Sequence, residues 1–397
     1  MGTGQVWLLP RHGREDYALM MKATALVVAA GRGHRAGSGL PKQYREVAGQ
    51  PLLRHAIRHL AAHPDIGEIR VVIHPDDHHL YEATVQGFDL LPPVHGGATR
   101  QDSVRAGLEA LDPATELVFV HDAARAFVPP ALLDGLFAAL EDAENDGAVP
   151  ALSVVDSLRR GGRHFTDSVN RDGLWRVQTP QAFRFGALLA AHRDAAQGAT
   201  DELGIALAAG LKVAITLGDE RAFKITEPRD FDNAMSNFVN RAASGFDVHA
   251  FGPGNHVWLC GVQIAHSHGL MGHSDADAGL HALTDALLGT IAAGDIGDHF
   301  PPTDDQWRGA SSDRFLSHAA ELVRAYGGMI DFVDVTLICE RPKIGPHRAA
   351  MQARVAEILG LRVDQVSIKA TTTERLGFAG RSEGIAAQAM ASVRVPA

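Results

Sequence analysis

Short apolar runs alternate with helix-like stretches along the first half of the chain. The apolar runs occupy residues 26–30, 69–73, 117–120, 147–152 and 211–217. Helical periodicity fills several of the intervals between them, at residues 51–62, 103–111 and 130–143. Strands that alternate with helices predict an α/β domain with a doubly wound, mostly parallel sheet and helices on both faces. Ligands of such sheets bind beyond the carboxyl ends of the strands, so the chemistry is expected in the loops that follow them.

The pattern fades at residues 233–244 (NAMSNFVNRAAS), which we predict to be a short polar connection. It then resumes with helix candidates at 277–293 and 346–359 and strand candidates at 332–339, 365–370 and 385–393. We therefore place a boundary near residue 242. The predicted parts are an N-terminal extension, 1–22, a first domain, 23–241, and a second domain, 242–397.

Composition narrows the classes of protein to which the chain can belong. It has 397 residues, of which 46% are hydrophobic and 21% charged, as is typical of globular proteins with two or three domains. A net charge of −10 argues against nucleic-acid binding. With only two cysteines and no apolar run near 18 residues, a disulfide framework and a membrane partner are not expected. We expect a cytoplasmic location.

The first predicted strand runs into a glycine-rich segment, 31–43, that contains Arg35 and Lys42. Glycines let backbone N–H groups approach phosphate oxygens, and the two cations supply the charge that a triphosphate needs. Three further segments favour the same chemistry: a glycine pair and a hydroxyl at a helix start (96–104), a carboxylate after a strand that can hold Mg²⁺ (121–125), and a lysine in an apolar setting (223–226).

The second domain has a different set of candidate residues. Asp247 and His249 are two apart on a predicted strand, so they share one face of it. His281 lies on a predicted helix one turn from both Asp277 and Asp285. Two histidines and a carboxylate with an open fourth position are typical of a catalytic Zn²⁺ site.

The first half resembles 2-C-methyl-D-erythritol 4-phosphate cytidylyltransferase over about residues 23–240. The motifs that carry the resemblance are AAGRGHRAGSGLPKQY, GGATRQDSVRAG, VHDAARAFV, LWRVQTPQAF, ATDE and FKITEPRDF. This family joins CMP from CTP to methylerythritol phosphate, with Mg²⁺ or Mn²⁺, and releases pyrophosphate. The resemblance implies nucleotide-binding roles for Ala29, Ala30, Gly31, Gly33, Gly97, Ser103, Asp122 and Ala123. It implies catalytic roles for Arg35, Lys42, Arg171 and Lys224, and substrate contacts by Arg125, Ser157 and Thr179.

The second half resembles 2-C-methyl-D-erythritol 2,4-cyclodiphosphate synthase over about residues 245–395. The motifs are FDVHAFG, GHSDADAGLHALTDALLGTIAAGDIGDHFP and KATTTERLGFAGRSEGIA. This resemblance implies an α+β domain that trimerises, with each site between neighbouring subunits. It implies Zn²⁺, or another divalent cation, on Asp247, His249 and His281, and Mg²⁺ or Mn²⁺ on Glu374. The implied substrate contacts are His273, Ser274, Asp295, Gly297, Lys343, Thr371, Thr372, Phe378 and Arg381.

Together the two resemblances predict a bifunctional enzyme of non-mevalonate isoprenoid precursor synthesis. Its substrates would be CTP, methylerythritol phosphate and CDP-methylerythritol 2-phosphate, and it would be a homotrimer or hexamer. The kinase that acts between the two steps is a candidate partner. Two alternatives stay open at this point: only one half is active, with the first half a generic sugar-nucleotide pyrophosphorylase, or the chain is a non-catalytic scaffold that binds cytidine nucleotides.

Overall fold

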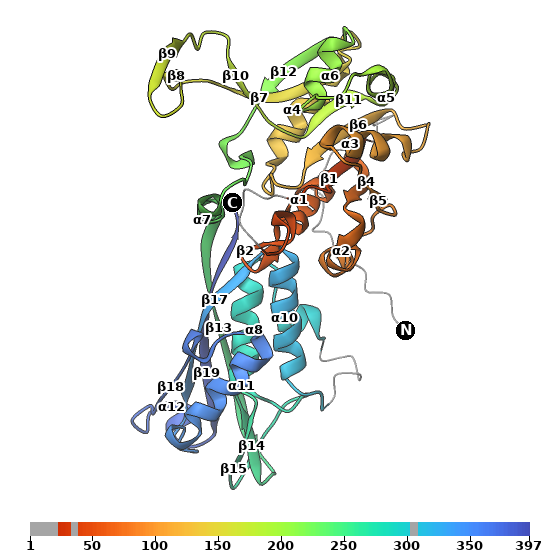
Figure 1. Cartoon of the computed structure of the whole chain (residues 1–397). Coiled ribbons are helices and arrows are strands. Elements are labelled where there is room, and N and C mark those ends of the chain that lie inside the picture. The colour runs from red at the N-terminus through yellow and green to blue at the C-terminus, as the bar shows by residue number, and fades with distance from the viewer. Residues whose placement is uncertain (1–22, 33–38, 302–308) are drawn as a thin grey trace. The chain divides into compact units, whose positions relative to one another are not determined.

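The computed structural model describes residues 23–32, 39–301 and 309–397. Contacts between residues divide the chain into two compact units, and the division falls between Met235 and Ser236. Both units appear in Figure 1.

The N-terminal unit is built on a sheet with the strand order β10-β7-β11-β6-β1-β4-β5, in which β12 also pairs with β7. Strands β1, β4, β5 and β6 run parallel to one another, β12 runs parallel to β7, and β10 and β11 are antiparallel to their neighbours. The strands are β1 (Ala23–Ala29), β4 (Ile66–Ile73), β5 (Val94–His95), β6 (Leu117–Asp122), β7 (Gly147–Ser153), β10 (Trp175–Val177), β11 (Gln181–Arg184) and β12 (Val213–Leu217).

Helices cover both faces of this sheet. Alternate residues of β1 point to opposite faces, so Val27 packs in one apolar cluster and Leu26 in another. The first cluster contains residues of α1 (Leu52–Ala61), α2 (His78–Val85) and α4 (Pro130–Glu141). The second contains residues of α3 (Arg100–Glu109), α5 (Phe185–Asp194) and α6 (Glu202–Ala208). The predicted doubly wound, mostly parallel sheet is confirmed.

Smaller elements complete the N-terminal unit. The hairpin of β8 (Leu158–Gly161) and β9 (Phe165–Val169) projects from the body of the unit (Figure 1). A short hairpin joins β2 (Glu46–Val47) and β3 (Gln50–Pro51), just after the 3-10 helix η2 (Lys42–Tyr44). Helix α7 (Pro228–Ala234) precedes the division between the units.

The C-terminal unit has a five-stranded sheet with the order β16-β13-β19-β17-β18. Its strands are β13 (Phe238–Gly252), β16 (Gly269–Leu270), β17 (Met329–Ile338), β18 (Val366–Thr371) and β19 (Gly384–Pro396). One face packs in a single apolar cluster with α8 (Ala278–Thr290), α10 (Asp313–Ala325) and α11 (Arg348–Leu359). The hairpin of β14 (His256–Leu259) and β15 (Val262–Ala265) and the short helices α9 (Ile296–His299) and α12 (Gly377–Gly380) complete this unit, which has the predicted α+β character.

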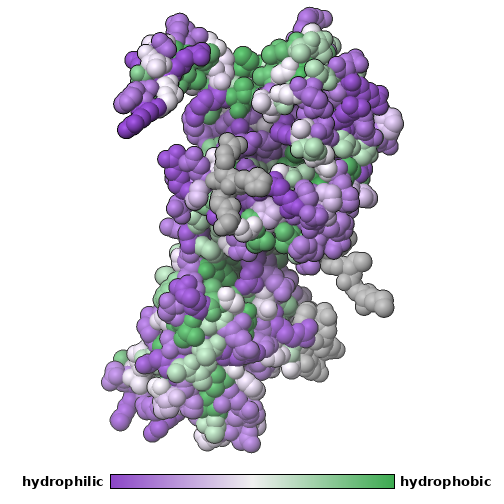
Figure 2. Space-filling view, viewed as in Figure 1, coloured by the Kyte–Doolittle hydropathy of each residue, from purple (hydrophilic) through white to green (hydrophobic). Residues whose placement is uncertain are grey.

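The other face of this sheet carries exposed apolar side chains. Phe246 is 59% exposed, Met390 54%, Phe332 42% and Val248 40%, although they lie on the three central strands. Figure 2 shows hydrophobic residues at the surface of this unit. On the opposite face α8 lies very close to β13, since a Cβ added to Gly245 would be 2.0 Å from the carbonyl oxygen of Ala282.

The segment 233–244, predicted to be a polar connection, is partly a strand. Strand β13 begins at Phe238 and pairs with β19 along its length, from Phe238–Pro396 to Ala250–Gly384. The first residues of β13 are mainly small or polar, because one of its faces packs closely on a helix and the other is open. Hydrophobic alternation therefore gave no signal here.

Candidate functional site

The predicted nucleotide site lies where parallel strands of the N-terminal unit end. Ala29 ends β1 and Asp122 ends β6, and the two strands are neighbours in register. The Ala123 amide donates to the Val28 carbonyl at 3.2 Å, which holds the loop after β6 against β1. The segments 29–31 and 121–125, which are far apart in the sequence, therefore lie side by side.

Four charged side chains form a network at the end of β6. Lys224 Nζ donates to Asp122 Oδ2 at 2.7 Å, and Arg100 Nε donates to Asp122 Oδ1 at 3.0 Å. Arg100 also donates to both carboxylate oxygens of Glu202, at 2.7 and 2.9 Å. Burial alone would raise the pKa of Asp122, but Arg100 and Lys224 bring that pKa below its usual range. Asp122 is therefore a carboxylate at neutral pH, suited to a divalent cation.

A chain of hydrogen bonds fixes the backbone of Asp122. His121 Nε2 lies 2.9 Å from the carbonyl oxygen of Arg125, which can only accept, so this nitrogen carries the proton. Burial lowers the pKa of His121 to about 4, so the ring is neutral and Nδ1 accepts from the Thr179 hydroxyl at 3.0 Å. The Thr179 oxygen in turn accepts from the Asp122 amide at 3.1 Å. Thr179 is buried, and in this structure it positions Asp122.

Lys42 is brought to the same edge of the sheet by η2. The neighbouring Gln43 donates from Nε2 to the Ala29 carbonyl at 2.7 Å, which ties η2 to the end of β1. Lys42 Nζ donates to the Ile225 carbonyl at 3.1 Å, next to Lys224. Lys42 and Lys224 are separated by 182 positions in the sequence, but both lie at the edge of the sheet where β1 and β6 end.

The glycine pair before α3 packs directly on the end of β1. A Cβ at Gly96 would lie 2.4 Å from the Ala30 Cβ and 2.6 Å from the Ser103 hydroxyl oxygen, so a larger residue would not fit. The Gly97 amide donates to Ser103 Oγ at 3.1 Å. Gly31, just beyond Ala30, is exposed, so the backbone at this edge is open to a ligand.

The remaining predicted residues of this half lie in different settings. The Arg125 guanidinium donates to the carbonyls of Ala222 at 2.8 Å and Val177 at 3.2 Å, so it ties backbone segments together. Ser157 and Arg171 are exposed and flank the projecting β8–β9 hairpin, and Arg171 donates to the Val155 carbonyl. Gly33 and Arg35 lie outside the described residues.

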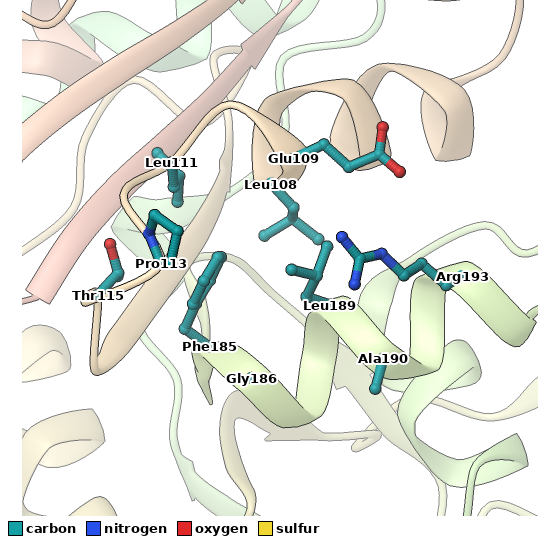
Figure 3. A pocket seen from close by; sticks show the side chains of 10 residues that line it. All are labelled: Leu108, Glu109, Leu111, Pro113, Thr115, Phe185, Gly186, Leu189, Ala190 and Arg193. Carbon is teal, nitrogen blue, oxygen red and sulfur yellow. The ribbon is translucent and has the colours of Figure 1, made fainter.

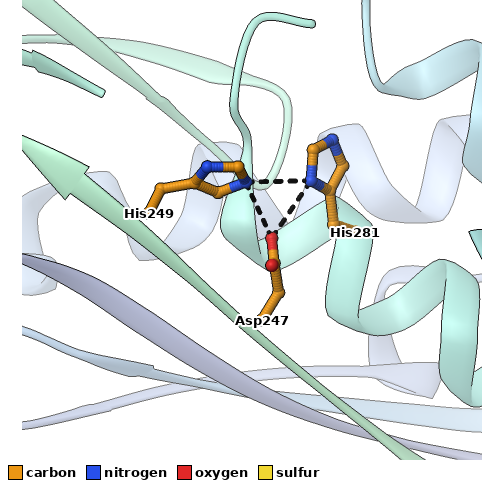
Figure 4. A group of neighbouring side chains, drawn as sticks. All are labelled: Asp247, His249 and His281. Atoms are coloured by element: carbon orange, nitrogen blue, oxygen red, sulfur yellow. Dashed lines mark hydrogen bonds and ion pairs between the residues drawn. The ribbon is translucent and has the colours of Figure 1, made fainter. Parts of the chain in front are cut away.

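In the C-terminal unit, Asp247, His249 and His281 form a compact cluster (Figure 4). Asp247 and His249 point from β13 toward His281 on α8. His249 Nε2 lies 2.9 Å and His281 Nδ1 3.0 Å from Asp247 Oδ2, and the two nitrogens are 3.1 Å apart. Burial would raise the pKa of Asp247, but its contacts with both histidines hold that pKa below its usual range.

The outer contacts of the two imidazoles fit a metal ion. His249 Nδ1 lies 2.8 Å from the Met271 carbonyl, which can only accept, so Nδ1 is the protonated nitrogen and Nε2 offers a lone pair. His281 Nε2 lies 2.8 Å from Ser312 Oγ, whose own proton goes to Asp275, so Nδ1 of His281 offers the second lone pair. Zn–N bonds of about 2.0–2.1 Å place tetrahedral ligand atoms about 3.3 Å apart, close to the observed spacing.

Two other predicted aspartates near this cluster have structural partners. Asp277 is fully buried and caps the start of α8, accepting from the amides of Leu280, Cys260 and Gly261. Asp285 accepts from the Ile296 amide at 2.8 Å. Asp247 is the carboxylate that joins the two histidines.

Some of the predicted substrate contacts adjoin this cluster. Ser274 Oγ lies 3.1 Å from His281 Nε2, and His273, next to it, is exposed. Asp295 caps α9 and accepts from the Gly297 amide at 2.8 Å. Since the Ile296 amide bonds to Asp285 on α8, this turn is tied to the helix that carries His281.

The other predicted contacts gather at the carboxyl ends of β17 and β18. The Cys339 amide donates to the Thr371 carbonyl at 3.1 Å, so the loop with Lys343 and the segment 371–374 are adjacent. Thr372 donates from Oγ1 to Glu374 Oε1 at 2.8 Å, and Lys343 is exposed. Phe378 is 38% exposed, and Arg381 forms a bidentate pair with Glu383 at 2.9 Å. Glu374 does not belong to the Asp247 cluster.

This second group is far from the metal cluster within one chain. The register connects Val248 through Ala386 and Ile338 to Thr371, one residue on each of four adjacent strands. Three steps between strands span about 14 Å. The two groups therefore cannot meet around one metal ion in a single chain.

A pocket of about 470 Å³ lies elsewhere, between α3, the loop after it and α5 (Figure 3). Its lining is mainly apolar, with Leu108, Phe185 and Leu189, and Glu109 and Arg193 are its charged residues. None of the predicted site residues that the structure describes lines it. It is near the amino end of β6, opposite the edge with the charged network.

Sequence reasoning did not single out Arg100 and Glu202, which belong to the network at Asp122. Both lie inside motifs that carried the family resemblance, but they are 102 positions apart, and neither position alone shows that their side chains meet. The signal that could have found them is the charge itself. The positive charge of an arginine in the first turn of a helix interacts unfavourably with the helix dipole, so a carboxylate partner is expected.

A doubly wound unit with charged side chains at the carboxyl ends of its strands, and a second unit with an Asp/His cluster that could hold a metal, are typical of a two-domain, metal-dependent enzyme of phosphate chemistry. Family models match both halves: 2-C-methyl-D-erythritol 4-phosphate cytidylyltransferase at residues 23–240 and the YgbB family at 240–394. A "Bifunctional enzyme IspD/IspF" of Rhizorhabdus wittichii is 58% identical over 94% of this chain and 97% of the relative. A protein of the same name from Paramagnetospirillum magneticum is 55% identical over 95% of this chain and 100% of the relative. The solved structure "Bifunctional IspDF from Campylobacter jejuni" is 32% identical, covering 94% of this chain and 98% of that chain, with a TM-score of 0.48.

The chain therefore belongs to the bifunctional IspD/IspF family. Its first half is a methylerythritol phosphate cytidylyltransferase and its second half a cyclodiphosphate synthase, so the predicted pair of activities is confirmed. Both halves belong to families that depend on divalent metals. Among the described residues, no helix is long and apolar enough to cross a membrane.

Proposed function

We propose that CTP binds at the edge of the N-terminal sheet where β1 and β6 end. The exposed backbone of Gly31 and the adjoining segments of Ala29, Ala30, Gly97 and Ala123 would hold the nucleotide, together with Gly33 and Ser103. The observation that supports this most directly is the position of Asp122. Its carboxylate lies beside Lys224 at this edge and would hold Mg²⁺ or Mn²⁺ on the phosphates.

In the transfer step, a phosphate oxygen of methylerythritol phosphate attacks the α-phosphorus of CTP. The bond to the β-phosphate breaks, and pyrophosphate leaves with that electron pair. Lys42 and Lys224, with Arg35, would neutralise the charge that develops on the α-phosphate. Ser157 and Arg171 lie near the projecting hairpin and would reach the methylerythritol phosphate, whereas Arg125 and Thr179 would shape this site through the backbone and Asp122.

In the C-terminal unit, Asp247, His249 and His281 would hold a divalent cation, which we propose is Zn²⁺. The cluster offers two imidazole lone pairs and one carboxylate, which are ligands that Zn²⁺ prefers. Glu374 would hold a second cation, Mg²⁺ or Mn²⁺. When bound, such cations would supply Lewis-acid polarisation of the phosphorus centres of the substrate. The 2-phosphate oxygen of CDP-methylerythritol 2-phosphate attacks the β-phosphorus, and CMP leaves.

Side chains of the chain would orient this second substrate. His273 and Ser274 would bind the terminal phosphate, Asp295 and Gly297 the erythritol hydroxyls, and Thr371 and Thr372 the diphosphate. Lys343 would lie at the cytidine, and the remaining predicted contacts are Phe378 and Arg381.

We propose that the cyclase site forms between subunits of a trimer. Three strand spacings, about 14 Å, separate β13, which carries two of the metal ligands, from the end of β18, which the Lys343 loop adjoins, so a neighbouring subunit would supply one of the two groups. The exposed apolar face of Phe246, Val248, Phe332 and Met390 would be buried around the trimer axis. On the projecting hairpin Phe165 is 84% exposed, and pairing of hairpins would make a hexamer.

The two reactions are not consecutive, because a phosphate must be added between them. The intermediate would leave, be phosphorylated by a kinase and return, and that kinase is a candidate partner. We expect these steps in the cytoplasm.

Assays of the purified full chain test this function. With Mg²⁺, pyrophosphate should be released from CTP only when methylerythritol phosphate is present, and CMP only from CDP-methylerythritol 2-phosphate. Pyrophosphate release with other sugar phosphates would favour a generic pyrophosphorylase. Tight binding of CTP and zinc without turnover would favour a scaffold.

A further inference from the structure

We propose that Glu202 and Arg100 are positioning residues for cytidylyl transfer. Glu202 holds Arg100 against one oxygen of Asp122, and this leaves the other oxygen available to the cation that accompanies CTP. The inference rests on the proposed metal-binding role of Asp122.

The N–H groups of the Arg100 guanidinium point to two carboxylates, those of Asp122 and Glu202. Its Nε and one terminal nitrogen lie 3.0 and 2.9 Å from Asp122 Oδ1, and its two terminal nitrogens donate to Glu202 at 2.7 and 2.9 Å. The planar guanidinium is thus held in one orientation by a two-point contact. Arg100 is a fixed part of the scaffold and has little left to offer a phosphate.

Arg100 and Glu202 each lie where a charged side chain is unfavourable without an oppositely charged partner. Arg100 is in the first turn of α3, where the helix dipole disfavours a cation. Glu202 is 1% exposed at the start of α6, and a buried carboxylate requires a partner. Each charge therefore makes the other tolerable, and together they bring a cation to Asp122 Oδ1.

This arrangement separates the two oxygens of Asp122 by role. Oδ1 is held by Arg100, while the partner of Oδ2 among the described residues is Lys224, whose side chain is 37% exposed and can move. Oδ2 would be the oxygen offered to a cation that accompanies CTP, Lys224 would then be released to the phosphates, and Arg100 would keep the carboxylate in its orientation. The two carboxylates and two cations of the network sum to zero charge; without Glu202 the sum is +1, and the Arg100 donors are free.

The experiment uses the full chain with Glu202→Gln and measures CTP binding by calorimetry, without methylerythritol phosphate so that no turnover occurs. CTP with Mn²⁺ should bind about tenfold or more weakly than to the wild type, in line with other residues that orient metal ligands. CTP in EDTA should bind as well or better, because a cation has been freed. The kcat of transfer should fall by about 10- to 100-fold, while the cyclase of the same chain keeps its rate.

Glu109→Gln is the matched control, because it removes the partner of Arg105, 3.1 Å away on the same helix but exposed. If Glu202→Gln binds both forms of CTP as Glu109→Gln does, the inference is wrong. Arg100→Lys cannot make the two-point contact and should show the same loss with Mn²⁺; unchanged Mn²⁺-dependent binding there also overturns it. If Asp122→Asn binds CTP with Mn²⁺ like the wild type, the proposed role of Asp122 fails instead.

Discussion

The two candidate sites differ in how much of each is present in one chain. In the N-terminal unit, Lys42, Asp122 and Lys224 come from distant segments and meet at one edge of a sheet. In the C-terminal unit, Asp247, His249 and His281 meet, but the end of β18, next to the Lys343 loop, lies three strand spacings, about 14 Å, from β13.

This difference follows from the folds. Parallel strands bring all of their carboxyl ends to one edge, so a doubly wound sheet collects residues from many segments in one place. In the described part of the chain, helices pack on one face of the C-terminal sheet, and the other face exposes the apolar side chains that the proposed trimer would bury. We therefore expect the first activity to depend on local charges and the second to depend on both the metal and the assembly.

The largest expected effect separates the two activities completely. His281→Ala leaves two metal ligands, which cannot hold a tetrahedral ion tightly, so the cyclase should lose its activity and the bound metal. Pyrophosphate release should persist. His268→Ala, at an exposed histidine outside the cluster, is the control. Stoichiometric, tightly bound zinc in purified His281→Ala, measured by metal analysis, would contradict the assignment.

The reverse separation is expected at Lys224. Removing a cation beside the reacting phosphate commonly costs about 10² to 10³ in rate, so Lys224→Ala and Lys42→Ala should each lower transfer by that amount and spare the cyclase. Lys212→Ala removes an exposed lysine paired with Glu144 and serves as the control. Transfer above a tenth of the wild-type rate in Lys224→Ala or Lys42→Ala would show that the role was misassigned.

A smaller effect concerns acid stability of the N-terminal unit. Burial lowers the pKa of His55 to about 3 and that of His192 to about 4, so the unfolded chain binds more protons than the folded chain as the pH falls below 6.5. The stabilisation of the folded chain by these neutral histidines is complete above pH 6.5. It is lost as the pH falls toward the pKa values that the two side chains have in the folded chain. Between pH 7 and pH 5, each of these histidines should lower the free energy of unfolding by about 2 kcal/mol.

Hydrogen exchange in β1 and β6, corrected for intrinsic rates, measures this loss. His192→Gln should flatten the pH dependence, whereas His268→Gln in the other unit should leave it unchanged. An equally steep dependence in His192→Gln would refute the explanation.

Much of the fold could be predicted where strands are long and apolar. The predicted strands at 26–30 and 117–120 and the helix at 277–293 correspond to β1, β6 and α8 within a few residues. Strand β11 has only four residues, too few for a period, although it lies between β6 and β7. The two-residue spacing predicted that Asp247 and His249 share a face, but helical spacing pointed from His281 to Asp277 and Asp285, and only the family resemblance joined His281 to Asp247 and His249. The pairing of Arg100 with Glu202 depends on how α3 and α6 pack.

The most direct test of the account is complementation between two inactive variants. Lys343→Ala and His281→Ala each damage a different part of the cyclase site and should be inactive alone. If the site is shared between neighbours, dissociating and reassembling a mixture should create interfaces with both parts intact, and part of the cyclase activity should return. No recovery after verified mixing, or a monomeric mass of the active wild-type chain by light scattering, would contradict the shared site.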